Sequence, residues 1–219
     1  MKILIVTATA GESDKIVSQR FGVHDIRVEV TGIGMVNTAY RLTKMLSSVP
    51  FDLVLNVGIC GCYNFRRPIG EVVHVKEEIL SEMGASDSDG HFLDLQRMGF
   101  KNFTVTGKDY YNRIENPNLL SDFFDHDLQA IPHVTGLTVN TVNGDTQRIN
   151  NTKKTFSPEI ENMEGGAVAS VCLQEGVPYF EFRSISNYVE PRDTSKWNIP
   201  LACASVQDFT IRMLSHLRK

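Results

Sequence analysis

Short apolar runs alternate with amphipathic stretches along much of this chain. Runs rich in Val, Ile and Leu are typical of buried strands, and three of them occupy Lys2–Thr7, Ile26–Thr31 and Leu53–Val57. Between the second and third runs, Asn37–Ser48 carries its apolar residues on one face at helical spacing. A strand, a helix and a strand in this order predict a βαβ unit with parallel strands.

The same alternation continues toward the C-terminal end of the chain. Further strands are expected at Glu71–Lys76, Phe103–Thr106, Val134–Thr141 and Tyr179–Ile185, and helices at Asn162–Glu175 and Ala202–Leu217. The polar stretch Ser81–Phe100 fits neither period and is expected to form a loop or an excursion, where a subunit contact could form. The sum predicts an α/β fold in which helices flank a mixed central β-sheet, with residues 1–219 forming a single domain.

Composition and charge narrow the class of protein. The chain has 219 residues, of which 42 % are hydrophobic and 22 % are charged, as in ordinary compact domains. Its net charge is −4 and it has no block of Lys and Arg, so nucleic acid is not an expected partner. No apolar run reaches the length of about 18 residues typical of a membrane span, and the apolar N-terminal run is too short for a signal peptide. No membrane partner is expected, and the sequence predicts a cytoplasmic protein.

The cysteines do not form a recognisable framework. Cys60, Cys62, Cys172 and Cys203 are irregularly spaced in a long chain, so free thiols are expected. Only one residue separates Cys60 from Cys62, and no matching His pair follows. Paired zinc ligands usually have at least two residues between them, so no metal site is expected.

Two glycine clusters lie where strands are predicted to end. The first, Thr31–Asn37, opens a helix as a dinucleotide-binding turn does, but it lacks the third glycine and the later acidic residue. No NAD is expected, and nothing else in the sequence indicates a cofactor. In the second cluster, Asn56–Gly61, glycines permit a tight turn and let a ligand approach the backbone closely. Either cluster could instead serve the turn alone.

Several motifs follow one another along nearly the whole chain. They are Met1–Ile3 with Glu12, Thr31–Gly34, Asn56–Gly61, Gly70–Val73, Gly144–Asp145, Met163–Gly165 and Arg183–Asn187. Their order and spacing resemble the nucleoside phosphorylase and nucleosidase superfamily, in particular its adenosylhomocysteine nucleosidase branch. Within that branch, Glu78–Ala85 and Ser186–Trp197 are similar to the futalosine hydrolases, which act in an alternative pathway to menaquinone. The resemblance implies a purine nucleoside substrate and a homodimer whose neighbouring subunit closes the pocket for the substrate tail.

Three residues are the candidate catalytic groups. Cleavage of a purine N-glycoside leaves a cationic ribose, so a negative charge beside it stabilises the transition state. Glu164 is expected to accept hydrogen bonds from the ribose hydroxyls and to supply that charge, and the resemblance implies that Glu12 activates the attacking water. Asn187 is the third group, at the C-terminal end of a predicted strand. In the alternative interpretation, Glu12 is a carboxylate at a helix N-terminus and Asn187 is a turn residue.

Asn187 departs from the adenine-releasing relatives, which carry an aspartate at the matching position. An amide can donate to N7 of a purine and also meet a 6-oxo group, which a carboxylate would repel. The sequence therefore favours release of hypoxanthine over release of adenine.

The remaining pocket residues follow from the same resemblance. Those expected to bind the substrate are Ile59, Gly61, Gln147, Arg148, Asn162, Met163 and Trp197. Gln147 and Arg148 stand where relatives have an aromatic that stacks on the base, and their polar groups could reach the purine oxygen. Trp197 stands where relatives have an aromatic lid, although a structural role in an interface is an alternative.

The superfamily contains both hydrolases and phosphorylases. Ile59 stands where the phosphorylases have a hydroxyl, and no arginine follows the first strand in the loop at residues 7–13. Since phosphate needs such donors, water is the expected nucleophile. The alternatives are an adenosylhomocysteine or methylthioadenosine nucleosidase, a purine nucleoside phosphorylase, and a nucleoside-binding protein without turnover.

Overall fold

The first strand, β1 (Lys2–Thr7), carries apolar side chains on both of its faces. In the computed structural model, which describes residues 1–22, 24–125 and 131–218, Leu4 packs with Leu42 and Val168 on one side of the sheet. Its neighbour Ile3 packs with Val206 on the other side. Because successive strand residues point to opposite faces, this pattern requires a sheet that is covered on both sides.

The main sheet is mixed. Its strands are β1, β2 (Asp25–Val30), β3 (Leu53–Cys62), β4 (Val72–Leu80), β9 (Arg113–Glu115), β10 (His133–Thr138), β11 (Ile160–Asn162) and β12 (Tyr179–Tyr188). Their order is β11-β10-β4-β12-β3-β1-β2, and β9 pairs with β4. The end of β3 also pairs with β11, so β3, β11, β10, β4 and β12 form a closed circuit of strands.

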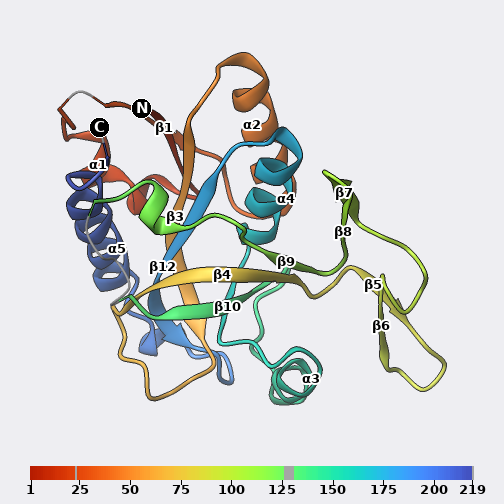
Figure 1. Cartoon of the computed structure of the whole chain (residues 1–219). Helices are drawn as coiled ribbons and strands as arrows, with labels where there is room; N and C mark the ends of the chain where they lie inside the picture. The colour runs from red at the N-terminus through yellow and green to blue at the C-terminus, as the bar shows by residue number, and fades with distance from the viewer. Residues whose placement is uncertain (23, 126–130, 219) are drawn as a thin grey trace.

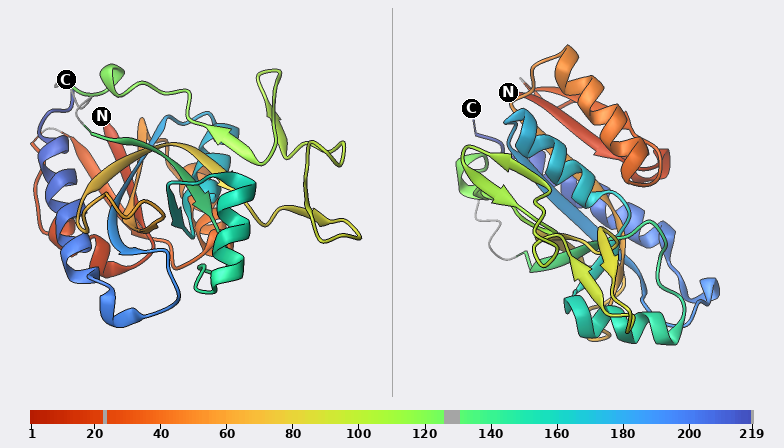
Figure 2. Two further views of the ribbon diagram at one scale, coloured as in Figure 1. Left: turned by 90° about the horizontal axis from the view of Figure 1, so that it is seen from below. Right: turned by 90° about the vertical axis from the view of Figure 1, so that its right-hand side faces the viewer.

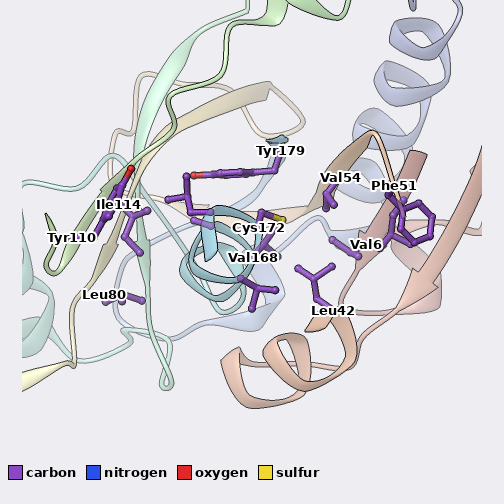
Figure 3. Packing of buried hydrophobic residues seen from close by; sticks show 14 residues of the cluster. Val6, Leu42, Phe51, Val54, Leu80, Tyr110, Ile114, Val168, Cys172 and Tyr179 are labelled. Atoms are coloured by element: carbon purple, nitrogen blue, oxygen red, sulfur yellow. The ribbon is translucent and has the colours of Figure 1, made fainter. Parts of the chain in front are cut away.

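Helices cover both faces of this sheet (Figure 1). They are α1 (Asp14–Val17), α2 (Met35–Ser48), α3 (Thr146–Phe156), α4 (Gly165–Glu175) and α5 (Ile199–Leu214), and short 3-10 turns lie at η1 (Ala10–Glu12), η2 (Leu120–Asp122) and η4 (Thr194–Lys196). Helix α5 lies on one face, and α2 and α4 lie together on the other. Figure 3 shows Leu42 and Val168 of these two helices beside Val6 and Val54 of the sheet.

Two small hairpins extend away from the body of the molecule (Figure 2). One pairs β5 (Gly84–Ser86) with β6 (Phe92–Asp94), and the other pairs β7 (Phe103–Val105) with β8 (Lys108–Tyr110). No helix in the described part of the chain is long and apolar enough to cross a membrane.

The predicted fold class, an α/β fold with a mixed central sheet flanked by helices, is confirmed. Two details of the prediction were wrong. The glycine cluster Asn56–Gly61 does not end its strand but lies inside β3, which continues to Cys62. The segment predicted as a helix from Asn162 begins with the last residue of strand β11, and its helix starts at Gly165. The polar stretch at 81–100, expected to form a loop or an excursion, contains the β5–β6 hairpin, which extends away from the body of the molecule.

Helix α3 was not predicted at all. Only Ile149 of its residues is buried, so the helix has no apolar stripe that periodicity could reveal. What marks its start is a local signal, because the Asp145 side chain accepts a hydrogen bond from the backbone N–H of Arg148 and caps the helix.

Candidate active site

The sheet, the start of α4 and the segment before α5 enclose a cavity of about 330 Å³. Eight of the predicted residues line it: Glu12, Ile59, Gly61, Asn162, Met163, Glu164, Asn187 and Trp197. They come from η1, β3, β11, β12, the N-cap of α4 and the segment that precedes α5. The fold therefore brings together residues that are up to 185 positions apart, from Glu12 to Trp197.

Glu12 lies in the turn that follows β1 and is only 4 % exposed. Its Oε2 accepts hydrogen bonds from the backbone N–H of Thr9 at 2.8 Å and from the Thr9 hydroxyl at 3.0 Å. Its Oε1 accepts the backbone N–H of Ile59 at 3.1 Å. Burial raises the pKa of Glu12, while the nearby Arg183 charge and these N–H groups act against the rise. A carboxylate with a raised pKa is a better proton acceptor at neutral pH.

Glu164 lies at the N-terminus of α4, where local chemistry explains its position. The side-chain oxygen of Asn162 accepts hydrogen bonds from the backbone N–H groups of Glu164 and Gly165 at 2.9 and 2.7 Å. Asn162 thus provides an acceptor for two N–H groups that have no partner within the helix. The Glu164 carboxylate then reaches the N-terminus of α2, where its Oε1 accepts the Gly34 N–H at 3.0 Å. Glu164 is 6 % exposed and retains free lone pairs toward the cavity.

Arg183 lies behind these two carboxylates and was not predicted as a site residue. Its side chain is 1 % exposed; its Nη1 is 3.4 Å from Glu164 Oε2, and its Nε is 2.7 Å from Glu181 Oε1. A Cβ atom on Gly58 would lie 2.5 Å from Arg183 Nη1 and 2.8 Å from Glu12 Oε1, so both groups approach the same glycine. The signal in the sequence was the presence of two charged residues, Glu181 and Arg183, within the strand β12, because buried charges need partners.

Two further buried carboxyl groups lie beside this part of the site. Glu78 contacts Asn162, and Glu181 contacts Arg183. Glu78 accepts hydrogen bonds from the Asn162 amide and the Thr138 hydroxyl, both at 2.6 Å. Burial and the neighbouring Glu181 raise the pKa of Glu78 well above its ordinary value, which favours its protonated form. Both carboxyl groups lie against Gly165, so a side chain at this position would displace them.

Asn187 lies on the other side of the cavity, near the end of β12. Its Oδ1 accepts a hydrogen bond from the Ser186 hydroxyl at 2.7 Å, and its Nδ2 donates to the Tyr188 carbonyl at 3.1 Å. The Tyr188 carbonyl can only accept a hydrogen bond and so fixes the orientation of the amide, which leaves one N–H of Nδ2 to donate to a ligand.

Three further residues at this side form a network that the sequence did not reveal. Glu161 and Asn143, 4 % and 7 % exposed, line the cavity, and Tyr63 lies behind them. Glu161 Oε2 accepts the Tyr63 hydroxyl and one Asn143 side-chain N–H, both at 2.7 Å. Its Oε1 accepts the backbone N–H of Asn143 at 2.9 Å. None of the three belongs to a short motif, and they are separated by up to 98 residues in sequence.

The structure does not place Gln147 and Arg148 at the cavity. Both lie in the first turn of α3, beside a separate and more open hollow that also borders Phe92 and Phe156. Arg148 Nη2 is held by Glu82 Oε1 at 2.6 Å. The capped start of α3 directs both residues to that hollow, so their predicted contact with a purine is not supported.

Trp197 lines the cavity together with the aliphatic side chains of Ile33 and Ile199. The guanidinium of Arg192 lies 4.9 Å from the centre of its ring. This contact is a cation–π interaction, which restricts the position of the indole at the cavity.

The fold and the cavity define a class of protein, and comparison with known proteins agrees with it. The sequence profile of the phosphorylase superfamily matches residues 5–217, and the chain belongs to this superfamily. Among its relatives is a futalosine hydrolase of Thermus thermophilus, 29 % identical over 186 residues that cover 84 % of this chain and 79 % of the relative. A 5′-methylthioadenosine/S-adenosylhomocysteine nucleosidase of Geobacillus sp. is 25 % identical over 202 residues, which cover 89 % and 82 % of the two chains.

Solved structures share the same fold. The native structure of the futalosine hydrolase of Helicobacter pylori superposes with a TM-score of 0.79 at 18 % identity, and the match covers 98 % of this chain and 97 % of that one. At this identity the likeness concerns the fold.

Proposed function

We propose that this protein hydrolyses the N-glycosidic bond of futalosine and releases hypoxanthine and dehypoxanthine futalosine. The observation that carries the proposal is the cavity itself: Glu12 and Glu164 lie around the buried Arg183 at one side, and Asn187 lies at the other. The relatives named as futalosine hydrolases support the choice of substrate.

The arrangement supports a direct displacement by water. Glu12 accepts a proton from the water as the water oxygen bonds to the ribose C1′, and the C1′–N9 electron pair leaves with the purine. The purine then takes a proton from solvent, and Glu12 returns its proton to solvent. Glu164 accepts hydrogen bonds from the ribose hydroxyls and stabilises the positive charge that develops on the ribose. Asn187 donates an N–H to N7, where negative charge accumulates on the leaving base.

The lining of the cavity favours water over phosphate as the nucleophile. A phosphate dianion needs several cationic or hydroxyl donors, and among the described residues around the cavity there is no arginine or lysine. Arg183 is fully buried behind the lining and already paired with two carboxylates. This composition supports the choice of a hydrolase over a phosphorylase.

Asn187 supports hypoxanthine as the base that is released. A carboxylate at this place would repel the 6-oxo group of the purine, whereas the amide carries no charge. The substrate assignment also implies a place in menaquinone biosynthesis and a cytoplasmic location.

A homodimer is part of the same proposal. On α2 and just before it, Ile33, Val36 and Tyr40 are 57 %, 80 % and 64 % exposed, and Ile33 also lines the cavity. Exposed apolar side chains at the edge of a site are typical of an interaction surface. A second copy of the chain on this surface would close the cavity over the substrate tail.

One assay separates these possibilities. The purified protein is incubated with futalosine, inosine and adenosylhomocysteine in phosphate-free buffer, and the released base is identified by chromatography. We expect hypoxanthine from futalosine alone. Adenine from adenosylhomocysteine would instead assign the second candidate, the activity named for the Geobacillus relative. A requirement for phosphate would show that the enzyme is a phosphorylase, and binding without release would show that it is a nucleoside-binding protein.

A further inference from the structure

Gly61 lies between two polar side chains that face the cavity. In the sheet it pairs with Glu161 of β11 on one side and with Asn187 of β12 on the other. A Cβ atom on Gly61 would lie 3.3 Å from Asn187 Nδ2 and 3.4 Å from the Cγ of Glu161. Because residues in register on neighbouring strands share a face of the sheet, Glu161 and Asn187 flank a flat strip of backbone at the floor of the cavity.

The hydrogen-bond donors around Glu161 are all in use. The Tyr63 hydroxyl and the Asn143 backbone N–H donate to Glu161. The two hydrogens of Asn143 Nδ2 go to Glu161 Oε2 at 2.7 Å and to the Tyr63 oxygen at 3.0 Å. This pattern fixes the orientation of the Asn143 amide, because the reversed amide would place its oxygen against the carboxylate.

What remains free in this network can only accept a hydrogen bond. Asn143 Oδ1 is buried and has no hydrogen-bond partner in the described part of the chain. Glu161 Oε1 accepts one N–H and has a second lone pair. A buried acceptor without a partner is costly, so a ligand that fills this side of the cavity has to present a donor.

We propose that Glu161 and Asn143 form an acceptor pair that recognises the N1–H group of a 6-oxopurine, and so determine which base the enzyme releases. The inference rests on the proposed function and adds a second point of recognition to Asn187. A 6-oxopurine has a donor at N1 and acceptors at O6 and N7. The donor at N1 matches the acceptor pair at Glu161 and Asn143, on one side of Gly61. The acceptor at N7 matches the donor at Asn187, on the other side.

A 6-aminopurine has the opposite pattern at N1. Its N1 is an acceptor, which would face the lone pairs of Glu161 and Asn143 and leave them unpaired. A site built to hydrogen-bond a group discriminates strongly against a ligand that lacks it, because its buried polar atoms lose their partner. The network thus selects by the same chemistry as Asn187 but at a different atom of the base.

The test compares bases that differ at N1. Binding of free hypoxanthine, 1-methylhypoxanthine and adenine is measured by calorimetry on the wild-type protein and on the variants Glu161→Gln and Asn143→Ala. We expect wild type to bind hypoxanthine more tightly than the other two bases. Each variant should reduce that preference by about 10- to 100-fold, the value of one hydrogen bond to a charged or buried group. Turnover of futalosine and its 6-amino analogue should show the same change in the ratio of kcat/KM.

Matched controls separate recognition from structural damage. Glu159→Gln makes the same change two residues away, outside the cavity, and Asn140→Ala shortens an exposed asparagine; both should keep the wild-type preference. Thermal unfolding of all variants reports whether the network holds the fold. If Glu161→Gln and Asn143→Ala remain folded and keep the wild-type preference among the three bases, the inference is wrong. Since base binding needs no turnover, a failure of the proposed hydrolysis would appear separately, as absence of release from futalosine.

Discussion

Both sides of the cavity contain buried carboxylates, but the groups that stabilise these carboxylates differ between the two sides. On one side Glu12 and Glu164 lie around Arg183, and Gly58 of β3 lets these groups approach the strand. On the other side, three positions further along β3, Gly61 lies beside Glu161, whose hydrogen-bond donors are neutral groups. The same strand thus carries an ionic subsite at one glycine and a hydrogen-bonding subsite at the other.

Under the proposed function, this difference corresponds to two tasks. Burial raises the pKa of both Glu12 and Glu161; Arg183 is the main opposing influence for Glu12, and the hydrogen bonds of Tyr63 and Asn143 are the main ones for Glu161. Fixed charge beside the ribose stabilises a cation that exists only in the transition state. Neutral donors beside the base hold one carboxylate in place so that its remaining lone pair can select a ligand. Charge therefore serves rate at one side, and directional hydrogen bonds serve specificity at the other.

The largest effect is expected from Glu12→Gln, which breaks the ionic subsite. The amide keeps the size of the side chain but cannot take a proton from water, so kcat for futalosine should fall by about 10²- to 10⁴-fold. The KM and the preference among bases should change little, because Glu161 and Asn143 are untouched. Steady-state kinetics measures this, with Asp14→Asn, an exposed residue of the next helix, as the matched control. A large loss of base preference in Glu12→Gln would show that the two subsites are not separate.

Asn187→Asp should have the next largest effect, because it makes the hydrogen-bonding subsite ionic. The new carboxylate would share the floor of the cavity with Glu161, on the two sides of Gly61. We expect hypoxanthine release from futalosine to fall by about 10- to 100-fold, since a charged acceptor replaces a donor. Release of adenine from the 6-amino analogue should rise or hold. Chromatography of the products measures both, and an equal loss on the two substrates would contradict the assignment of Asn187.

Gly61→Ala should act on binding more than on chemistry. The new methyl group would lie 3.0 Å from Val189 Cγ2 and close to both Asn187 and Glu161, at the floor where the base is proposed to lie. A rise in KM of about tenfold with a smaller change in kcat is expected, the effect of about 1.4 kcal/mol of lost binding. Gly11→Ala is the control, because its Cβ atom would meet nothing within 4 Å. A fall in kcat alone would place Gly61 in the chemical step.

These two subsites also differ in how far the sequence predicted them. Glu12, Glu164 and Asn187 were predicted because each belongs to a short motif of the family resemblance, after a strand end or at the start of a helix. Glu161, Asn143 and Tyr63 were not, because their network exists only once β11 pairs with β3 and the segment before α3 packs beside them. Gln147 and Arg148 were assigned to the cavity from their place after Gly144–Asp145, but the Asp145 cap begins a helix there.

The strands and most helices were predictable for a different reason. Buried strands such as β1 need apolar residues on both faces, a pattern that is visible in any window of the sequence. Helix α3 and strand β11 lack such a pattern or are too short to show one. Strand β11 depends on long-range pairing with β10 and β3, which a one-dimensional pattern does not contain, whereas only the local cap at Asp145 marks the start of α3.

The smallest expected effect concerns pH and would sharpen the contrast between the two carboxylates. Burial raises the pKa of Glu161 above its ordinary value, so acidification protonates this group earlier than an exposed carboxyl. Ionised Glu161 accepts the N1–H of a 6-oxopurine; protonated Glu161 can instead donate to the N1 of a 6-aminopurine. The preference for hypoxanthine over adenine should therefore be greatest above the pKa of Glu161 and fall by a few-fold as pH decreases through it. Calorimetry of both bases across the pH range measures the ratio, which cancels effects common to the two ligands. The variant Glu161→Gln has no titrating group at this position, so its ratio of affinities should no longer depend on pH in this range. If the ratio still changes with pH in Glu161→Gln, the effect belongs to another group, such as Glu12.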